Sequence, residues 1–317
     1  MDNVCHTFVG LAAARTGLNS TSRYATATLA IASNLPDIDA LAFVADVPVV
    51  ALRRGWTHGV LAQAVLPVAF AGVMWMLARR TAHRAPPSAH SGRRTAHFGW
   101  LTLLSYIGVL SHVGLDYLNN YGVRLLMPFS DRWFYGDSVF IVDIWMWLML
   151  GAGVFLARRG RRWIAGAGIA AAAVYIALMV VSASRARAIV MDRWIETFGA
   201  PPASLMVGPM PLTPLRKNII VDAGDGYVVG RFHWFPRHVN FNPAPILKND
   251  MNPWVARARE QEPDFDYILV WARFPYYELE QDPKGVRVTL RDARFPRGIR
   301  GFSATTYVQR QMFARVR

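Results

Sequence analysis

Apolar runs separated by short polar segments dominate the first part of the chain. Four runs approach the roughly 20 residues that cross a bilayer as a helix: 59–78, 99–118, 140–157 and 163–183. Shorter helices are expected at 4–15 and 23–33. The apolar residues 40–52 are too few to span, so we expect them to re-enter the membrane or lie at its surface. The pattern predicts an α-helical integral membrane domain with about four spans and short or re-entrant N-terminal helices.

The pattern changes after about residue 200, where short apolar segments alternate with turn residues. Residues 218–222 and 227–232 flank Gly224-Asp225-Gly226, an arrangement typical of a β-hairpin. A short helix is expected at 252–261. Three further segments have strand character, residues 266–274, 285–291 and 304–314. We therefore predict three parts, a membrane domain over 1–183, a linker over 184–199 and a small β-rich or α+β extramembrane domain over 200–317.

Composition and charge support a membrane protein and indicate its orientation. Charged residues make up 18% of the chain, below the roughly 25% of soluble domains. The net charge of +14 does not predict a nucleic-acid partner, because arginines flank apolar runs and no nucleic-acid motif is visible. Arginine-rich loops at 79–98 and 158–162 are expected to be cytoplasmic. The C-terminal domain then lies on the non-cytoplasmic side of a bacterial-type inner membrane, although Arg53 and Arg54 run against this assignment.

Six side chains that can bind a metal occur in the part of the chain predicted to be the membrane domain. They are His6, Asp37, Asp39, His58, His112 and Asp116. Ionisable groups at membrane depth are costly and usually mark a site. His112 and Asp116 are four residues apart, so on a helix they share one face. The alternative is a histidine that is hydrogen-bonded inside a helix bundle, with Asp116 capping or facing water. The single cysteine, Cys5, excludes an intrachain disulfide and a cysteine-rich zinc site.

Each of the other candidate metal ligands can also have a purely structural role. Asp37 and Asp39 follow a break at Pro36, and such a pair can bind one cation or bridge two, or form a turn and a helix cap. His58 can ligate a metal with Thr57 as support, or be an ordinary residue at a membrane boundary. His6 lies near the start of the chain and can belong to a frayed end. The expected topology places His58, His112 and Asp116 at the non-cytoplasmic face, and the break at Pro36-Asp37 joins them there if residues 23–52 form a hairpin on that side.

Four ordered motifs resemble the YdjM-like inner-membrane metal-dependent hydrolases over about residues 1–160. They are His6-Thr7-x-x-Gly10, Pro36-Asp37-x-Asp39, Arg54-Gly55-x-Thr57-His58 and His112-x-x-x-Asp116. The resemblance implies an integral membrane hydrolase in which these motifs form the metal site. Residues 200–317 carry no such resemblance.

Together these features favour metal-assisted hydrolysis. One or two divalent ions, zinc first among them, would be held by the six candidate ligands, and Asp37 or Asp39 would be the catalytic base. A site at the bilayer face favours a lipid-linked ester or phosphoester as substrate. The alternative is a non-enzymatic membrane scaffold or sensor with a structural metal. A metal or proton transporter ranks third, because the polar residues gather at one face instead of spreading through the membrane.

Overall fold

The computed structural model describes residues 1–44, 49–83, 95–157, 161–295 and 302–310. Its contacts divide the chain into two compact units. The first comprises Met1–Asp39, Arg54–Ala183 and Pro209–Pro214, and the second comprises Ala40–Arg53, Ser184–Gly208 and Leu215–Arg317. Residues 184–199, expected as a linker, belong to helix α7 up to its end at Phe198.

The first unit is helical. Its elements are α1 (Asn3–Arg15), η1 (Leu18–Ser20), α2 (Ala25–Ala32), the start of η2 (Leu35–Val44), α4 (Val60–His83), α5 (Phe98–Tyr117), α6 (Ile144–Leu156) and the first part of α7 (Arg162–Phe198). Among the described residues, three helices are long and apolar enough to cross a membrane, namely α4, α5 and α7. The expected span at 140–157 is not confirmed, because the 13 residues of α6 extend only about 20 Å.

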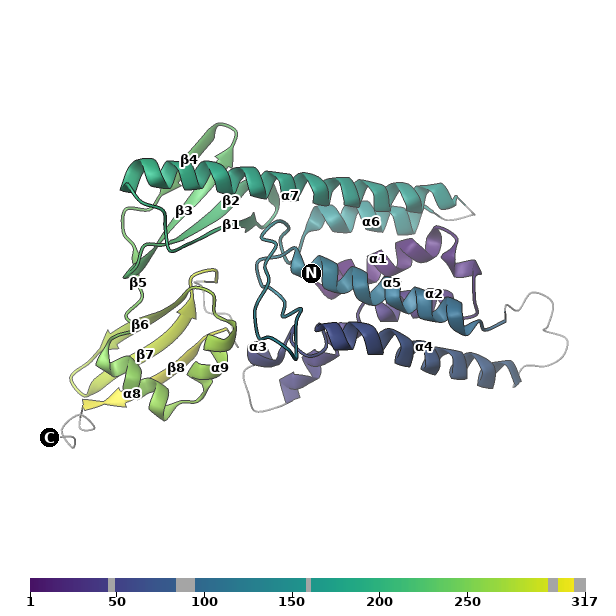
Figure 1. The fold of residues 1–317 in the computed structure, drawn as a ribbon, viewed down its shortest axis with the longest axis horizontal. Helices are drawn as coiled ribbons and strands as arrows, with labels where there is room; N and C mark the ends of the chain where they lie inside the picture. The colour runs from purple at the N-terminus through teal and green to yellow at the C-terminus, as the bar shows by residue number, and fades with distance from the viewer. Residues whose placement is uncertain (45–48, 84–94, 158–160, 296–301, 311–317) are drawn as a thin grey trace. The chain divides into compact units, whose positions relative to one another are not determined.

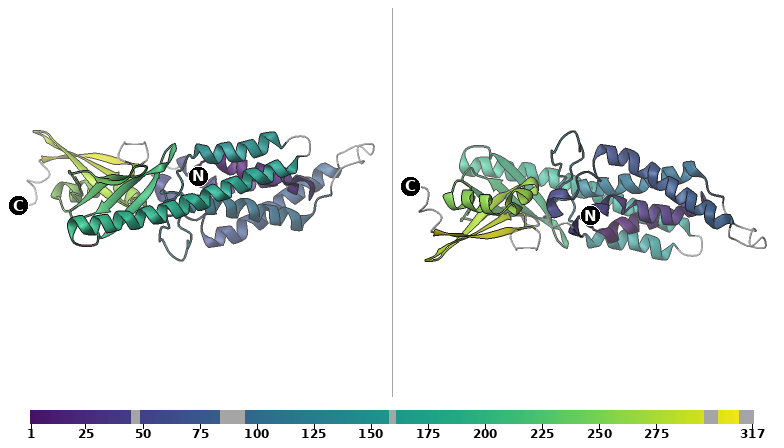
Figure 2. Two further views of the ribbon diagram at one scale, coloured as in Figure 1. Left: turned by 90° about the horizontal axis from the view of Figure 1, so that it is seen from above. Right: turned by 90° about the horizontal axis from the view of Figure 1, so that it is seen from below.

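The helices of this unit lie side by side (Figure 1; Figure 2). Helix α1 packs against α2 and α6, and α5 packs against α2 and α4. A Cβ on Gly10 would come within 2.6 Å of the carbonyl oxygen of Leu29, and one on Gly108 within 2.6 Å of the Ala32 Cβ. Because glycine lacks that atom, α1 and α5 can both approach α2 closely.

The second unit is rich in β-sheet. Its elements are α3 (Val49–Leu52), the end of α7, β1 (Ser204–Met210), β2 (Thr213–Asp222), β3 (Gly226–Trp234), β4 (Arg237–Phe241), β5 (Ile246–Leu247), α8 (Pro253–Gln261), α9 (Asp264–Trp271), β6 (Pro275–Gln281), β7 (Gly285–Asp292) and β8 (Ala304–Gln309). One sheet has the order β1-β2-β3-β4, with β5 also on β3, and the other has the order β6-β7-β8.

The predicted hairpin around residue 225 is confirmed, since Asp222 pairs with Tyr227 and Ile219 with Gly230 across β2 and β3. The predicted strand at 266–274 is wrong for most of its length, because these residues form α9. Its buried residues Phe265, Ile268 and Trp271 recur every three residues, which is a helical period and not a strand period.

Two hydrophobic clusters hold the second unit together. Ala186, Val190 and Trp194 of α7 cover one face of the first sheet, where they pack with Ile219 and Phe232. Met206, Ile220 and Tyr227 on the other face pack against Tyr276 of β6 and against Phe274, which precedes β6. The end of α7 and both sheets therefore form one folded body.

Lys217 is a buried charge in this body and leads to a stability prediction. It lies opposite Phe232 in the β2–β3 ladder and is 1% exposed. Burial lowers the pKa of its ammonium group from 10.5 to about 8. The cost of burying the cation, about 3 kcal/mol at 1.36 kcal/mol per pKa unit, is fully present below pH 8. It disappears as the pH rises toward 10.5, since the folded state then holds fewer protons than the unfolded state.

We therefore expect Lys217→Met to raise the thermal unfolding temperature of the full chain at pH 7, and this gain to shrink between pH 8 and 10.5. Near-ultraviolet circular dichroism in detergent measures both effects. The matched control is Lys284→Met, because Lys284 is exposed. An equal gain in the two variants at pH 7, or a gain for Lys217→Met that does not change with pH, would contradict the prediction.

Candidate metal centre

The last two turns of α5 provide a histidine and an aspartate on one face. His112 and Asp116 are both 0% exposed, and Nε2 of His112 lies 3.5 Å from Oδ2 of Asp116. The spacing of four residues puts them one helical turn apart, as the sequence predicts. The site is therefore built at the end of a membrane-length helix.

The orientation of His112 is fixed by the backbone of the segment that follows α2. Its Nδ1 lies 2.8 Å from the carbonyl oxygen of Ser33. A carbonyl oxygen can only accept, so Nδ1 carries the proton and Nε2 keeps a lone pair. Gly108, one turn earlier on α5, allows this approach, because a Cβ there would lie 2.8 Å from the backbone nitrogen of Ser33. A backbone carbonyl on the outer nitrogen is a common support of metal-binding histidines.

His58 is oriented in the same way by a carboxylate. The Thr57 hydroxyl donates to Oδ2 of Asp39 at 3.0 Å and lies 3.0 Å from Nδ1 of His58. Oδ2 of Asp39 is 3.4 Å from the same nitrogen. Nδ1 of His58 therefore donates, and its Nε2 keeps a lone pair. Burial lowers the pKa of His58 below its usual range, although Asp39 opposes this effect.

The free nitrogens of the two histidines face each other and two carboxylates. Nε2 of His58 lies 3.2 Å from Nε2 of His112 and 3.3 Å from Oδ2 of Asp116. Asp37 completes the group, with Oδ1 at 3.8 Å from Nε2 of His112. One ligand atom from each of these four buried residues lies within 4.8 Å of the others. Four lone-pair atoms converging in a buried space repel one another without a cation, so this group could hold a metal ion.

Two of the six predicted ligands, His6 and Asp39, lie outside the group of four. His6 stacks on His112 with ring centroids 3.8 Å apart, and its Nε2 is 3.3 Å from Oδ1 of Asp116. It therefore borders the group of four on the far side of Asp116. Asp39 contacts the outer nitrogen of His58 and accepts from the backbone N–H of Arg54 at 2.7 Å. It acts as a support for His58 in this geometry.

Sequence reasoning did not assign a role to Arg54, which is 4% exposed. Its Nη2 donates to Oδ1 of Asp116 at 2.9 Å and its Nη1 donates to Oδ1 of Asn119 at 3.0 Å. The guanidinium also lies 4.5 Å from the centroid of the Tyr121 ring, and the amino group of Met1 contacts Asp116 as well. The sequence carried a signal for Arg54, because it is an arginine inside the motif that ends at His58 and the expected topology disfavours an arginine there.

Arg124 is a second buried cation beside the site. Its backbone N–H donates to the carbonyl of Arg54 at 2.9 Å, and its guanidinium lies 5.1 Å from the centroid of the Trp133 ring. A Cβ on Gly55 would be 2.5 Å from Nη2 of Arg124, so glycine makes room for it. Burial lowers the pKa of Arg124, while Asp131 and Asp39 oppose the shift.

Asp143 and Asp2, two acidic residues beside apolar helices, have structural roles. Asp143 caps α6 by accepting from the backbone N–H groups of Trp145 and Met146, and it accepts from the Tyr175 hydroxyl at 2.8 Å. Asp2 caps α1 and accepts from Nε1 of Trp147 at 3.0 Å. These contacts explain why two carboxylates lie beside apolar helices.

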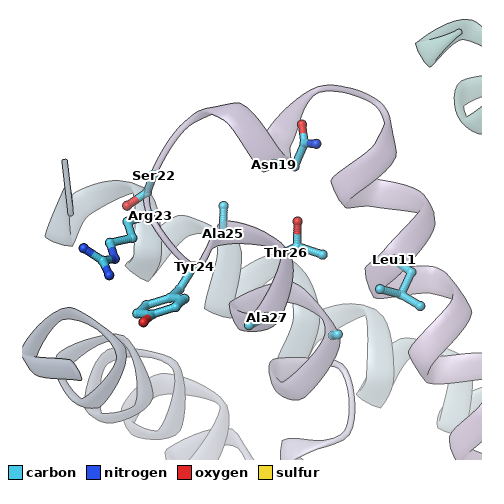
Figure 3. Close-up of a pocket in the computed structure, with 9 residues that line it drawn as sticks. Leu11, Asn19, Ser22, Arg23, Tyr24, Ala25, Thr26 and Ala27 are labelled. Carbon is cyan, nitrogen blue, oxygen red and sulfur yellow. The ribbon is translucent and has the colours of Figure 1, made fainter. Parts of the chain in front are cut away.

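A surface pocket of about 640 Å³ lies in the first unit around the start of α2 (Figure 3). Arg23 and Tyr24 stand together at one end of it, with the guanidinium 5.2 Å from the ring centroid. The pocket is lined by Leu11, Asn19, Ser22, Arg23, Tyr24, Ala25, Thr26, Ala27 and Ala30. None of the six metal-capable residues lines it, so it is separate from the candidate metal centre.

Comparison with known families agrees with the motifs. The model of the family described as YdjM inner membrane protein matches residues 1–186, more than half of the chain. The chain belongs to the YdjM inner membrane protein family. This match confirms the resemblance and a place in the inner membrane, and it covers every residue of the candidate metal centre. No curated protein and no solved structure shows a significant similarity to the chain.

Proposed function

We propose that this YdjM family member is a membrane-bound metal-dependent hydrolase. The observation that carries the proposal is the convergence of His58, His112, Asp37 and Asp116 through lone-pair atoms. Two nitrogens and two carboxylate oxygens suit zinc, and one or two ions can be accommodated with His6 at the border of the group. When bound, a divalent ion supplies Lewis acidity and makes water a nucleophile at neutral pH.

The side chains of the candidate metal centre then have different roles in the proposed reaction. His58 and His112 present neutral nitrogens, because Asp39 with Thr57 and the carbonyl of Ser33 hold their outer nitrogens. Asp37 is 7% exposed and farther from His112 than His58 and Asp116 are. We therefore leave His58, His112 and Asp116 as the three metal ligands of the hydrolase and assign Asp37 the role of general base, which takes the proton from the attacking water. Asp39, already engaged by Arg54 and Thr57, is less suited to that role.

The buried charges favour an anionic substrate. Among the side chains of the site, Arg54 and Arg124 contribute two positive charges, and Asp37, Asp39 and Asp116 contribute three negative charges, which leaves a formal side-chain charge of 2 − 3 = −1, without the Met1 amino group that contacts Asp116. A divalent ion changes this sum to +1. A phosphoester headgroup would offset that surplus, and guanidinium groups match phosphate geometry. A lipid-linked phosphoester is therefore the proposed substrate, with a lipid-linked carboxylester as the weaker alternative.

We also propose that the site and the C-terminal domain face the non-cytoplasmic side. The support is the arginine content of residues 79–98 and 158–162, which favours cytoplasmic loops at the opposite ends of the spans. A phosphatase reporter fused after Arg317 tests this placement, and it is expected to be active only if that end is exported. Strong activity of a cytoplasmic reporter at the same position would overturn the orientation.

A second function is a scaffold or sensor with a structural metal. The observation that favours it is the burial of all four donor residues, because four protein ligands can close a tetrahedral shell. A closed shell leaves no position for water or substrate. The two functions predict the same metal content but different chemistry.

Turnover of lipid substrates by the purified full chain distinguishes them. We expect metal-dependent cleavage of a phosphodiester or phosphomonoester lipid, and we expect Asp37→Asn to reduce it by about 10²- to 10⁴-fold, the usual contribution of a general base. Asp225→Asn is the matched control, since Asp225 is exposed in the β2–β3 turn. Full metal content without turnover on phosphoester or carboxylester lipids would favour the structural metal.

A further inference from the structure

The first sheet of the second unit carries two polar rows on one face. In the register of β2, β3 and β4, Arg216 lies opposite His233 and His233 opposite His238. The next row on this face is Asn218, Arg231 and Asn240. Alternate residues of a strand point to opposite faces, so these six side chains share the face opposite α7. We call them the cationic array.

The array places arginines and histidines on neighbouring strands of one face. Arg216, Arg231 and His238 are exposed and His233 is partly exposed. Within the described part of the chain, none of these four side chains forms an ion pair. The pKa of His233 lies below its usual range, because desolvation and the neighbouring His238, Arg216 and Arg231 all disfavour its protonation. At the β4 edge, Asp192 and Glu196 of α7 line a pocket with His238.

The other sheet of the same unit shows the usual arrangement. Arg287 on β7 lies opposite Glu280 on β6, and their side chains are 3.2 Å apart. Arg291 on β7 binds Glu278 on β6 at 2.7 Å. Cross-strand pairs of opposite charge stabilise a sheet, and like charges destabilise it. The missing acidic partners on β2–β4 therefore indicate that an external anion offsets the charge.

We propose that the cationic array binds the phosphate groups of anionic lipids at a bilayer surface. The array offers guanidinium, imidazole and amide donors, which suit phosphate oxygens. Phe235, at the tip of the β3–β4 hairpin beside the first row, is 79% exposed, and an aromatic residue beside basic ones is typical of contact with a membrane interface. The sheet is joined directly to α7, a candidate span, so lipid headgroups are the anions at high local concentration.

The proposal is tested with the full chain in nanodiscs of phosphatidylcholine, mixed with sedimentable vesicles. We expect binding to vesicles that contain phosphatidylglycerol and none to vesicles of phosphatidylcholine alone. The double variant Arg216→Gln/Arg231→Gln should weaken binding about 30-fold, since each basic residue near an anionic surface contributes about 1 kcal/mol. Phe235→Ala should weaken binding without changing its dependence on salt.

The matched control is Arg287→Gln/Arg291→Gln, which removes the same charge from arginines that are already paired with glutamates. It should bind as the wild type does, and circular dichroism verifies that each variant is folded. Wild-type affinity in Arg216→Gln/Arg231→Gln, or an equal loss in the two double variants, would overturn the proposal. Binding of duplex DNA without binding of anionic vesicles would overturn it as well, by assigning the array to a different polyanion.

Discussion

His112→Ala should abolish stoichiometric metal binding by the purified chain. The substitution removes the nitrogen that faces both His58 and Asp116. Loss of a supporting group around a metal costs about 10- to 100-fold in affinity, so loss of the ligand itself should exceed 100-fold. Asp39→Asn, which removes the carboxylate that supports His58 and leaves all four converging donor residues in place, should fall within the 10- to 100-fold range. Metal analysis and competition with a chelator measure both.

His97→Ala is the matched control, because His97 lies exposed at the other end of α5. The chelator should also lower the unfolding temperature of the wild type, since an ion that binds only the folded state stabilises it. The same treatment should leave His112→Ala unchanged. Equal metal content in the wild type and in His112→Ala would contradict the candidate metal centre.

The sequence predicts the positions of His112 and Asp116 better than those of Asp37 and Asp39. The spacing of His112 and Asp116 is local, and helix geometry alone places both on one face. The same reasoning could not show whether Asp37 or Asp39 faces the candidate metal centre, because a turn lets either carboxylate point inward. The structure separates them through Thr57 and the backbone N–H of Arg54, which bind Asp39. Those contacts join segments that are distant from α5 in the sequence.

The fold shows the same contrast between local and distant information. The β2–β3 hairpin was predictable because its turn residues and alternation lie within a few positions. The strand prediction over 266–274 is wrong because the apolar residues of α9 are nearly continuous, and a short apolar run fits either element. The span count depended on the length of α6, which ends at Leu156 after 13 residues. The carbonyl of Ser33 could not be predicted at all, since every residue has one.

Gly108→Ala should destabilise the helical unit and weaken metal binding together. The added Cβ would lie 2.6 Å from the Ala32 Cβ and 2.8 Å from backbone atoms of Ala32 and Ser33. These backbone atoms cannot rotate away, so α2 and α5 must separate. Overpacking of this kind costs about 1–3 kcal/mol. Separation also moves the carbonyl of Ser33 from Nδ1 of His112, so the affinity for metal should fall by about 10- to 100-fold, as for other supporting contacts.

Gly114→Ala tests whether this effect comes from the helix contact and not from the loss of a glycine. Gly114 lies on the same helix, and a Cβ there would meet no atom within 4 Å. Gly114→Ala should therefore keep the unfolding temperature and metal affinity of the wild type. Equal behaviour of the two variants would show that the approach of α2 to α5 does not position His112. A loss of stability in Gly108→Ala with unchanged metal affinity would separate the packing of these helices from the orientation of the histidine.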